Sequence, residues 1–333
     1  MGLNLDLELQ GRSLLTLADL TDKQMLKLVD LATELKARKQ AGTQIAAPLL
    51  HGRNLCLVFE KSSTRTRCAT VVAARDEGAT AEYLGKNDIH FGKKESVADS
   101  ARVLGRMFDG ILFRGFKHST VETLAKHAGV PVWNGLTDDW HPTQILADLQ
   151  TMKEHFGYLK GLKVVFVGDG RNNVCNSLMV GCAMAGVHVV DCCPPELAPT
   201  AAVLAMARTA ATRNGSTVTV CHDPVEAVAG ANVLYTDVWV SMGEESQFQQ
   251  RLELLRPYRI DTAMVENTGN LAAGKVIFLH CLPAYHNHDT EVTKELGALE
   301  VTDDVFEAPF SKVFDEAENR MHTIKAMILA SLV

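Results

Sequence analysis

Short runs of β-branched and apolar residues alternate with amphipathic helical stretches along the whole chain, and this alternation constrains the fold more than any other feature. The pattern is typical of parallel α/β domains, because parallel strands need a crossover connection, usually a helix. The strands predicted in the first half are 55–60, 111–113 and 130–133. Those predicted in the second half are 163–168, 187–191, 217–221, 232–235 and 276–280. We therefore expect an α/β fold of two doubly wound domains, each a central parallel sheet flanked by helices.

Length and composition set the number of domains. A chain of 333 residues with 47% hydrophobic content can build two cores. Apolar positions from Ile145 to Met152 continue one helical face until Gly157 breaks it, so we place the hinge at about 150–160. The predicted domains are 1–150 and 151–314. A final helix, about 311–332, is long enough to cross back to the first domain.

Two helix starts carry a capping-box pattern, in which the side chains of two residues three apart satisfy free backbone amides. The pairs are Thr21 with Gln24 and Ser119 with Glu122. We expect a helix to begin after Thr21 and another after Ser119.

Charge and cysteine content narrow the class of protein. Lysine plus arginine (33) minus aspartate plus glutamate (40) gives a net charge of −7, which argues against nucleic acid or an anionic membrane as a partner. No leader-like segment and no run of ~18 apolar residues is present. The eight cysteines include no CxxC pair, so we interpret them as reduced thiols and expect a cytoplasmic protein.

The densest chemistry lies at 61–67 (KSSTRTR), between a predicted strand and a predicted helix. Such a turn presents backbone amides, hydroxyls and the positive end of a helix to one point, and arginine adds bidentate anion recognition. Phosphate is the ligand that fits best. The alternative is an ordinary capped helix with solvated arginines. The segment is not a P-loop, because no Gly-x4-Gly-Lys precedes the hydroxyls.

Two further motifs fall in the same predicted domain. Arg114 ends a strand, where parallel sheets face their ligands, and Gly115 allows a tight exit. His141 and Gln144 lie on one helical face around Pro142, and an imidazole with an amide can hold a carbonyl group. The alternative for His141 is a simple helix cap.

The second half offers polar groups at the ends of three predicted strands. The segment 168–173 (GDGRNN) has the wrong glycine spacing for a dinucleotide fingerprint, but its asparagines suit an amino-acid head group. Asp237 would hold a substrate ammonium group. Cys281 ends another strand, although a buried structural thiol is an equal alternative.

Together these motifs resemble the ornithine carbamoyltransferases of the aspartate/ornithine carbamoyltransferase superfamily, over nearly the whole chain. The resemblance implies that the final helix, about 315–333, returns to the first domain. It assigns carbamoyl phosphate to Ser63, Thr64, Arg65, Thr66, Arg67, His90, Arg114, His141, Gln144, Cys281, Leu282 and Arg320, and ornithine to Asn173, Asp237, Ser241 and Met242. The implied catalytic residues are Arg65, Arg114, His141, Cys281 and Arg320.

The resemblance also implies the reaction: carbamoyl transfer from carbamoyl phosphate to the δ-amine of L-ornithine, giving L-citrulline and phosphate. The direction, in arginine biosynthesis or reversed in the arginine deiminase pathway, stays open. So do a carbamoyltransferase for another amine such as putrescine and a catalytically silent paralogue. We expect no cofactor and no metal, since His286 and His288 lack a third ligand.

The family pattern further implies a homotrimer, or an assembly of trimers, in which a neighbouring subunit completes each site. The loop that reaches into the neighbouring site carries His90 where many members of the family have glutamine. An imidazole there would make phosphate binding sensitive to pH, since histidine titrates near ~6.5.

Overall fold

The computed structural model describes all residues except 1–2, 4, 43–47, 90, 92–93 and 241–244. The chain divides into two compact units, one made of Met1–Gln150 with Glu318–Val333 and the other of Thr151–Ala317. The chain passes between the units inside two helices, α5 (Pro142–Phe156) and α12 (Val313–Leu332). Among the described helices, none combines the length and the hydropathy that a membrane-spanning segment needs.

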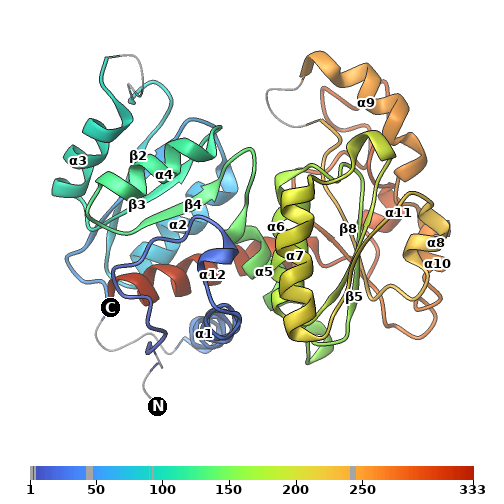
Figure 1. Cartoon of the computed structure of the whole chain (residues 1–333), viewed down its shortest axis with the longest axis horizontal. Coiled ribbons are helices and arrows are strands. Elements are labelled where there is room, and N and C mark those ends of the chain that lie inside the picture. The colour runs from blue at the N-terminus through green and yellow to red at the C-terminus, as the bar shows by residue number, and fades with distance from the viewer. Residues whose placement is uncertain (1–2, 4, 43–47, 90, 92–93, 241–244) are drawn as a thin grey trace. The chain divides into compact units, whose positions relative to one another are not determined.

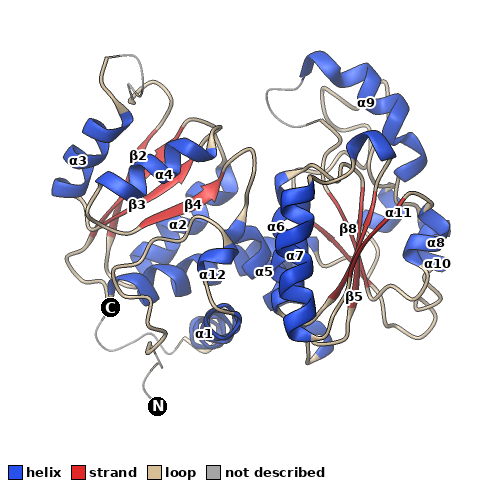
Figure 2. Cartoon of the chain, viewed as in Figure 1, coloured by secondary structure: helices blue, strands red, loops and turns tan. Residues whose placement is uncertain are grey.

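The first unit is built on a four-stranded parallel sheet in the order β2-β1-β3-β4 (Figure 2). Its strands are β1 (Asn54–Phe59), β2 (Thr80–Leu84), β3 (Gly110–Arg114) and β4 (Val132–Leu136). Its other helices are η1 (Leu17–Asp19), α1 (Asp22–Gln40), α2 (Thr64–Asp76), α3 (Val97–Met107) and α4 (His118–His127).

Alternating apolar side chains let helices cover both faces of this sheet. Buried residues of α3 and α4 pack on the face formed by alternate positions such as Cys56, Val58 and Phe113. On the opposite face the indole of Trp133 donates to Ser331 of α12, 3.1 Å away. Lys325 of α12 also pairs with Asp76 at the end of α2, which ties the C-terminal helix to the first unit.

The second unit contains a five-stranded parallel sheet in the order β7-β6-β5-β8-β9. Its strands are β5 (Lys163–Val167), β6 (His188–Cys192), β7 (Val218–Cys221), β8 (Val233–Thr236) and β9 (Ile277–His280). Its helices are α6 (Asn173–Met184), η2 (Pro195–Leu197), α7 (Ala201–Asn214), α8 (Pro224–Val228), η3 (Glu245–Gln247), α9 (Phe248–Leu255), η4 (Arg256–Tyr258), α10 (Thr262–Glu266) and α11 (Asp303–Phe306) (Figure 1). Helices α8, α10 and α11 pack on one face of the sheet through a core that includes Val165, Leu234 and Phe278.

The predicted fold class is confirmed: both units are parallel α/β, and the C-terminal helix packs against the first. All eight predicted strands overlap strands of the structure, but β2 was not predicted. The capping box at Thr21 is present, with Gln24 N donating to the Thr21 hydroxyl at 3.2 Å. The one predicted at Ser119 is wrong, because α4 begins at His118 and Lys117 is its N-cap. All eight cysteines are free.

Candidate functional site

Each sheet has a switch point, where successive strands begin to be added on the other side of the first strand. In the first unit it lies between β1 and β3, and in the second between β5 and β8. Ligands of open α/β sheets bind outside the carboxyl ends of the strands at such points. The polar segments singled out in the sequence follow these strands, so the topology gathers them into one half-site on each unit.

The first half-site begins at the N-terminus of α2. Ser63 is the N-cap, and its hydroxyl accepts from Thr66 N at 3.2 Å. The first amides of a helix lack intrahelical acceptors, and the helix dipole adds partial positive charge. Thr64 and Arg67 are exposed here, and the Arg67 guanidinium stacks 3.9 Å from the centre of the Tyr83 ring. The turn is therefore open to an anion.

Arg320 joins three segments of the first half-site that are distant in sequence. It lies on α12 and is buried, and its guanidinium donates to Gln144 Oε1 at 2.7 Å and to Thr66 Oγ1 at 3.1 Å. A longer contact, 3.4 Å, reaches Thr143 Oγ1. The Gln144 amide in turn donates to Asp148 at 2.8 Å, so both ends of that side chain are fixed. The final helix thereby fixes α2 and α5 relative to each other.

His141 lies among three guanidinium groups. It is buried immediately before α5, and its pKa lies well below the ordinary value because of burial first and then the charges of Arg320, Arg114 and Arg65. Arg114 ends β3 and is also buried, and its carbonyl accepts from Glu60 N. The half-site thus combines a neutral imidazole, which can donate a hydrogen bond, with a cluster of positive charge.

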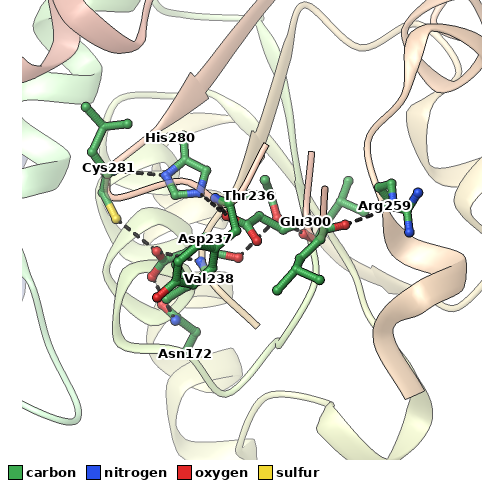
Figure 3. Close-up of polar contacts among 12 residues, drawn as sticks. Asn172, Thr236, Asp237, Val238, Arg259, His280, Cys281 and Glu300 are labelled. Atoms are coloured by element: carbon green, nitrogen blue, oxygen red, sulfur yellow. Dashed lines mark hydrogen bonds and ion pairs between the residues drawn. The ribbon is translucent and has the colours of Figure 1, made fainter. Parts of the chain in front are cut away.

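The second half-site consists of side chains that follow β5, β8 and β9 (Figure 3). Asn172 caps α6, and its amide donates to Asp237 Oδ2 at 2.9 Å. The Cys281 thiol donates to Asp237 Oδ1 at 3.1 Å, and Val238 N donates to the same oxygen at 2.8 Å. Asp237 is thus a carboxylate held in place by three donors at the switch point.

The loop before α6 is anchored by an ion pair. Asp169 pairs with Arg251, a buried residue of α9, and also accepts from Arg171 N at 2.9 Å. This pairing holds the loop that carries Asn172 against α9.

Three groups of the second half-site have metal-ligand chemistry. Donor atoms of Asp237, His280 and Cys281 lie within 4.8 Å of one another. However, His280 Nδ1 accepts from Leu282 N, its Nε2 faces Glu300, and the Cys281 thiol donates to Asp237. These groups therefore hydrogen bond to one another or to adjacent residues, which accounts for their proximity.

The structure brings together most residues that the sequence singled out. Ser63, Thr66, Arg65, Arg114, His141, Gln144 and Arg320 lie in the first half-site, and Asp237 and Cys281 in the second. Asn173 is the first residue of α6 and half-buried, whereas its neighbour Asn172 contacts Asp237. His90, Ser241 and Met242 lie outside the described residues. Sequence reasoning missed Thr143, Glu300 and the capping role of Asn172.

Comparisons with known proteins agree with this arrangement. A family model described as the aspartate/ornithine carbamoyltransferase carbamoyl-P binding domain matches residues 12–154, and one described as the Asp/Orn binding domain matches residues 160–331. Two curated relatives, from Bacillus licheniformis (54% identity, 99% of each chain) and Bacillus thuringiensis (56%, 97% of each), are both named ornithine carbamoyltransferase, catabolic. A solved ornithine carbamoyltransferase from Pyrococcus furiosus matches with a TM-score of 0.89 at 40% identity, over 97% of this chain and 98% of its own.

Proposed function

The chain belongs to the aspartate/ornithine carbamoyltransferase family, and we propose that it transfers the carbamoyl group between carbamoyl phosphate and the δ-amine of L-ornithine, with L-citrulline and phosphate as the other pair. The observation that carries the proposal is the pair of half-sites. One holds a buried histidine neutral in the field of three guanidinium groups, and the other presents a fixed carboxylate.

The first half-site suits the phosphate of the donor. Ser63 to Arg67 offer hydroxyls, amides at the start of α2 and two guanidinium groups, and Arg114 adds a third. Arginine matches a phosphate bidentately, and a helix N-terminus favours negative charge. We assign the phosphate to these residues.

The carbamoyl carbonyl becomes an oxyanion when an amine attacks it, and stabilising that charge is the main catalytic task. His141 is neutral at neutral pH. A neutral imidazole has one N–H group, which can donate a hydrogen bond to the developing oxyanion. Gln144 and Arg320 lie beside it with their side chains already fixed by hydrogen bonds. We assign the carbamoyl group to these three residues, together with Cys281 and Leu282.

Asp237 suits an acceptor that carries an α-ammonium group. An acidic acceptor would be repelled by this carboxylate, and an acetylated α-nitrogen would leave it without a cation. A diamine such as putrescine has no carboxylate for Asn173 to hold. The δ-amine must lose a proton to attack, and the departing phosphate can accept it as the tetrahedral adduct collapses. We therefore propose ornithine, with Asn173, Asp237, Ser241 and Met242 as its binding residues.

The same site serves both directions, because a catalyst lowers the barrier equally from either side. Two of the relatives above are named catabolic. On this support we propose that the enzyme works in the arginine deiminase pathway, where citrulline and phosphate give ornithine and carbamoyl phosphate.

A colorimetric citrulline assay tests the proposal. Purified protein with carbamoyl phosphate should give citrulline from ornithine. Parallel reactions would contain putrescine, N-acetylornithine or aspartate, with phosphate release as the common measurement. Phosphate release with one of these amines and not with ornithine would reject ornithine as the acceptor. No phosphate release with any amine would favour a catalytically silent paralogue.

We also propose a homotrimer, or an assembly of trimers, in which His90 completes the site of a neighbouring subunit. Light scattering should then give a mass of three chains of 36.3 kDa, or a multiple of it. A mass equal to a single chain would contradict the shared site.

A further inference from the structure

His280 makes an unusual contact with the backbone two residues further along the chain. It ends β9, is fully buried, and its Nδ1 accepts from Leu282 N at 2.9 Å. Leu282 has a φ of 59°, in the left-handed region that residues other than glycine rarely adopt. Among the described residues other than glycine, only Glu8 shares a positive φ. The contact with His280 therefore holds Leu282 in a conformation that costs free energy.

The hydrogen bond from Leu282 N fixes the tautomer of the ring. An Nδ1 that accepts a hydrogen bond has no proton, so the proton of the neutral ring is on Nε2. Nε2 faces Glu300 Oε1 at 3.3 Å (Figure 3). The same oxygen accepts from Tyr285 N at 2.6 Å. Glu300 is fully buried. The carboxylate is therefore placed to accept a hydrogen bond from Nε2 and to hold the ring with Nδ1 toward Leu282.

A second buried carboxylate fixes the backbone of His280 itself. Glu316 Oε2 accepts from His280 N at 2.9 Å, and its Oε1 accepts from Tyr235 OH at 3.1 Å. Glu316 thus fixes the backbone of His280 at the end of β9, and Glu300 fixes the orientation of its ring.

The residue between His280 and Leu282 is Cys281, whose thiol donates to Asp237 at 3.1 Å. A change in the backbone at Leu282 would redirect the Leu282 carbonyl and strain the peptide that joins Leu282 to Cys281. We propose that His280 is a positioning residue for the transfer reaction: its neutral imidazole, oriented by Glu300, holds Cys281 and Leu282 in the geometry that the reacting groups require. This inference rests on the proposed function, which places both residues beside the substrates.

The cost of the arrangement argues for more than stability. Glu300 Oε2 has no hydrogen-bond partner among the described residues, although the side chain is fully buried. Burying a carboxylate with incomplete hydrogen bonding is unfavourable, and apolar packing would stabilise the fold as well or better. Proteins accept such local costs mainly where function requires a fixed geometry.

Two amide substitutions test the hydrogen bonds of the two ring nitrogens separately. In His280→Asn the amide oxygen occupies about the place of Nδ1 and can still accept from Leu282 N, whereas the contact with Glu300 is lost. In His280→Gln the amide nitrogen reaches the place of Nε2 and can donate to Glu300, but Leu282 N loses its acceptor. Both variants bury one neutral amide, so they form a matched pair. His188→Asn, at a half-buried histidine of β6 that hydrogen bonds to Thr217, controls for the loss of a histidine elsewhere.

The measurement is steady-state kinetics with ornithine and carbamoyl phosphate, together with the thermal midpoint of each variant. We expect kcat to fall roughly 10- to 100-fold in H280Q, as for a reacting group displaced by about 1 Å, and clearly less in H280N. The Kd for inorganic phosphate, measured by titration calorimetry, should stay within about twofold in both, because the residues that we assign to the phosphate group are on the first unit.

Equal losses of kcat in H280N and H280Q, or a loss that follows the fall in thermal midpoint, would overturn the inference in favour of a structural role. A kcat of H280Q close to that of the wild type would overturn it too. Failure of the wild-type protein to make citrulline from ornithine would instead reject the proposed function, so the two failures are distinguishable.

Discussion

Arg320 is the residue that sequence patterns are least able to place. It follows Gln144 by 176 positions, and no periodicity links the two, yet its guanidinium bridges Gln144 and Thr66. Only the resemblance to a family gave it a role. Its partners come from the start of α2 and of α5, so the side chain sets the relative position of the two segments that we assign to phosphate and carbamoyl recognition.

Replacing Arg320 by lysine should therefore damage catalysis while keeping the charge. Lysine is a point charge and cannot satisfy Gln144 and Thr66 in the same fork. We expect kcat to fall about 10²- to 10³-fold, as on removal of one oxyanion donor. Steady-state kinetics measure this, and Arg102→Lys, on the exposed face of α3, is the matched control. A kcat of R320K within threefold of the wild type would show that charge alone suffices.

The protonation state of His141 gives a second prediction. Because burial and three arginines hold the pKa of His141 well below its ordinary 6.5, the ring is neutral at neutral pH and takes up a proton only at clearly lower pH. In His141→Gln, kcat/KM for carbamoyl phosphate should be lower at every pH, by about 10²-fold or more. The shape of its profile between pH 6 and 8 should match the wild type. A wild-type limb near pH 6.5 that vanishes in H141Q would contradict this.

Asn172 and Asn173 show where residue-level prediction stops. The sequence indicated that both amides lie near the ligand crevice, but it could not tell which one points where. Asn172 takes the N-cap position, with its oxygen accepting from Val174 N at 2.7 Å, and this fixes its nitrogen toward Asp237. The difference depends on a single backbone turn, which strand and helix periodicities do not specify.

At the scale of elements, the carboxyl end of β6 explains why the turn after β5 needs glycine at position 170. Asp191 is fully buried there and accepts from the thiol of Cys193 at 3.2 Å, with the Cys175 thiol at 3.5 Å. A Cβ on Gly170 would collide with the Asp191 carboxylate. Gly170 therefore permits close packing of the turn on β6.

Asp191 should make the stability of the second unit depend on pH. Burial raises its pKa to about 7, whereas an aspartate in the unfolded chain titrates near ~3.9. Between these values the folded protein holds one more proton, so the free energy of unfolding falls as the pH rises from about 4 to 7 and then levels off.

Asp191→Asn removes this titration. The free energy of unfolding of the variant, compared with that of the wild type, should therefore be higher at pH 8 than at pH 5. The difference grows by ~1.4 kcal/mol for each pH unit between pH 5 and the pKa of Asp191. Thermal midpoints at the two pH values measure the gain, with Asp289→Asn at an exposed position as the control. Parallel pH dependence in D191N and the wild type would mean that Asp191 is ionised in the folded protein at both values.

The elements that the sequence predicted are those with strong apolar runs. Buried strands such as β5 and β9 gave clear signals, since β-branched and apolar side chains fill nearly every position. Strand β2 was missed because it is an edge strand of mixed composition, TAEYL, and none of its residues is buried. The capping box at Ser119 was wrong because the local pattern also fits a position inside a helix, and α4 starts one residue earlier.

At the scale of the whole molecule, each half-site lies within one unit. The residues that we assign to phosphate have their described partners in the first unit, through α2, β3, α5 and the end of α12. Asp237 has its partners, Asn172, Val238 and Cys281, in the second. Phosphate affinity should therefore be set by the first unit alone, while turnover requires both.

Asp237→Asn tests this separation. The substitution removes the charge that we assign to the acceptor's α-ammonium group but keeps the volume of the side chain. Citrulline formation should fall at least about tenfold, consistent with ~1.5–3 kcal/mol for a hydrogen bond to a charged group. The Kd for inorganic phosphate, measured by titration calorimetry, should change by less than about twofold, because no donor of the anion site is altered. Arg65→Ala should weaken phosphate binding about tenfold or more. If D237N weakened phosphate binding as much as R65A does, the anion site would depend on the second unit, and two independent half-sites would be the wrong description of this enzyme.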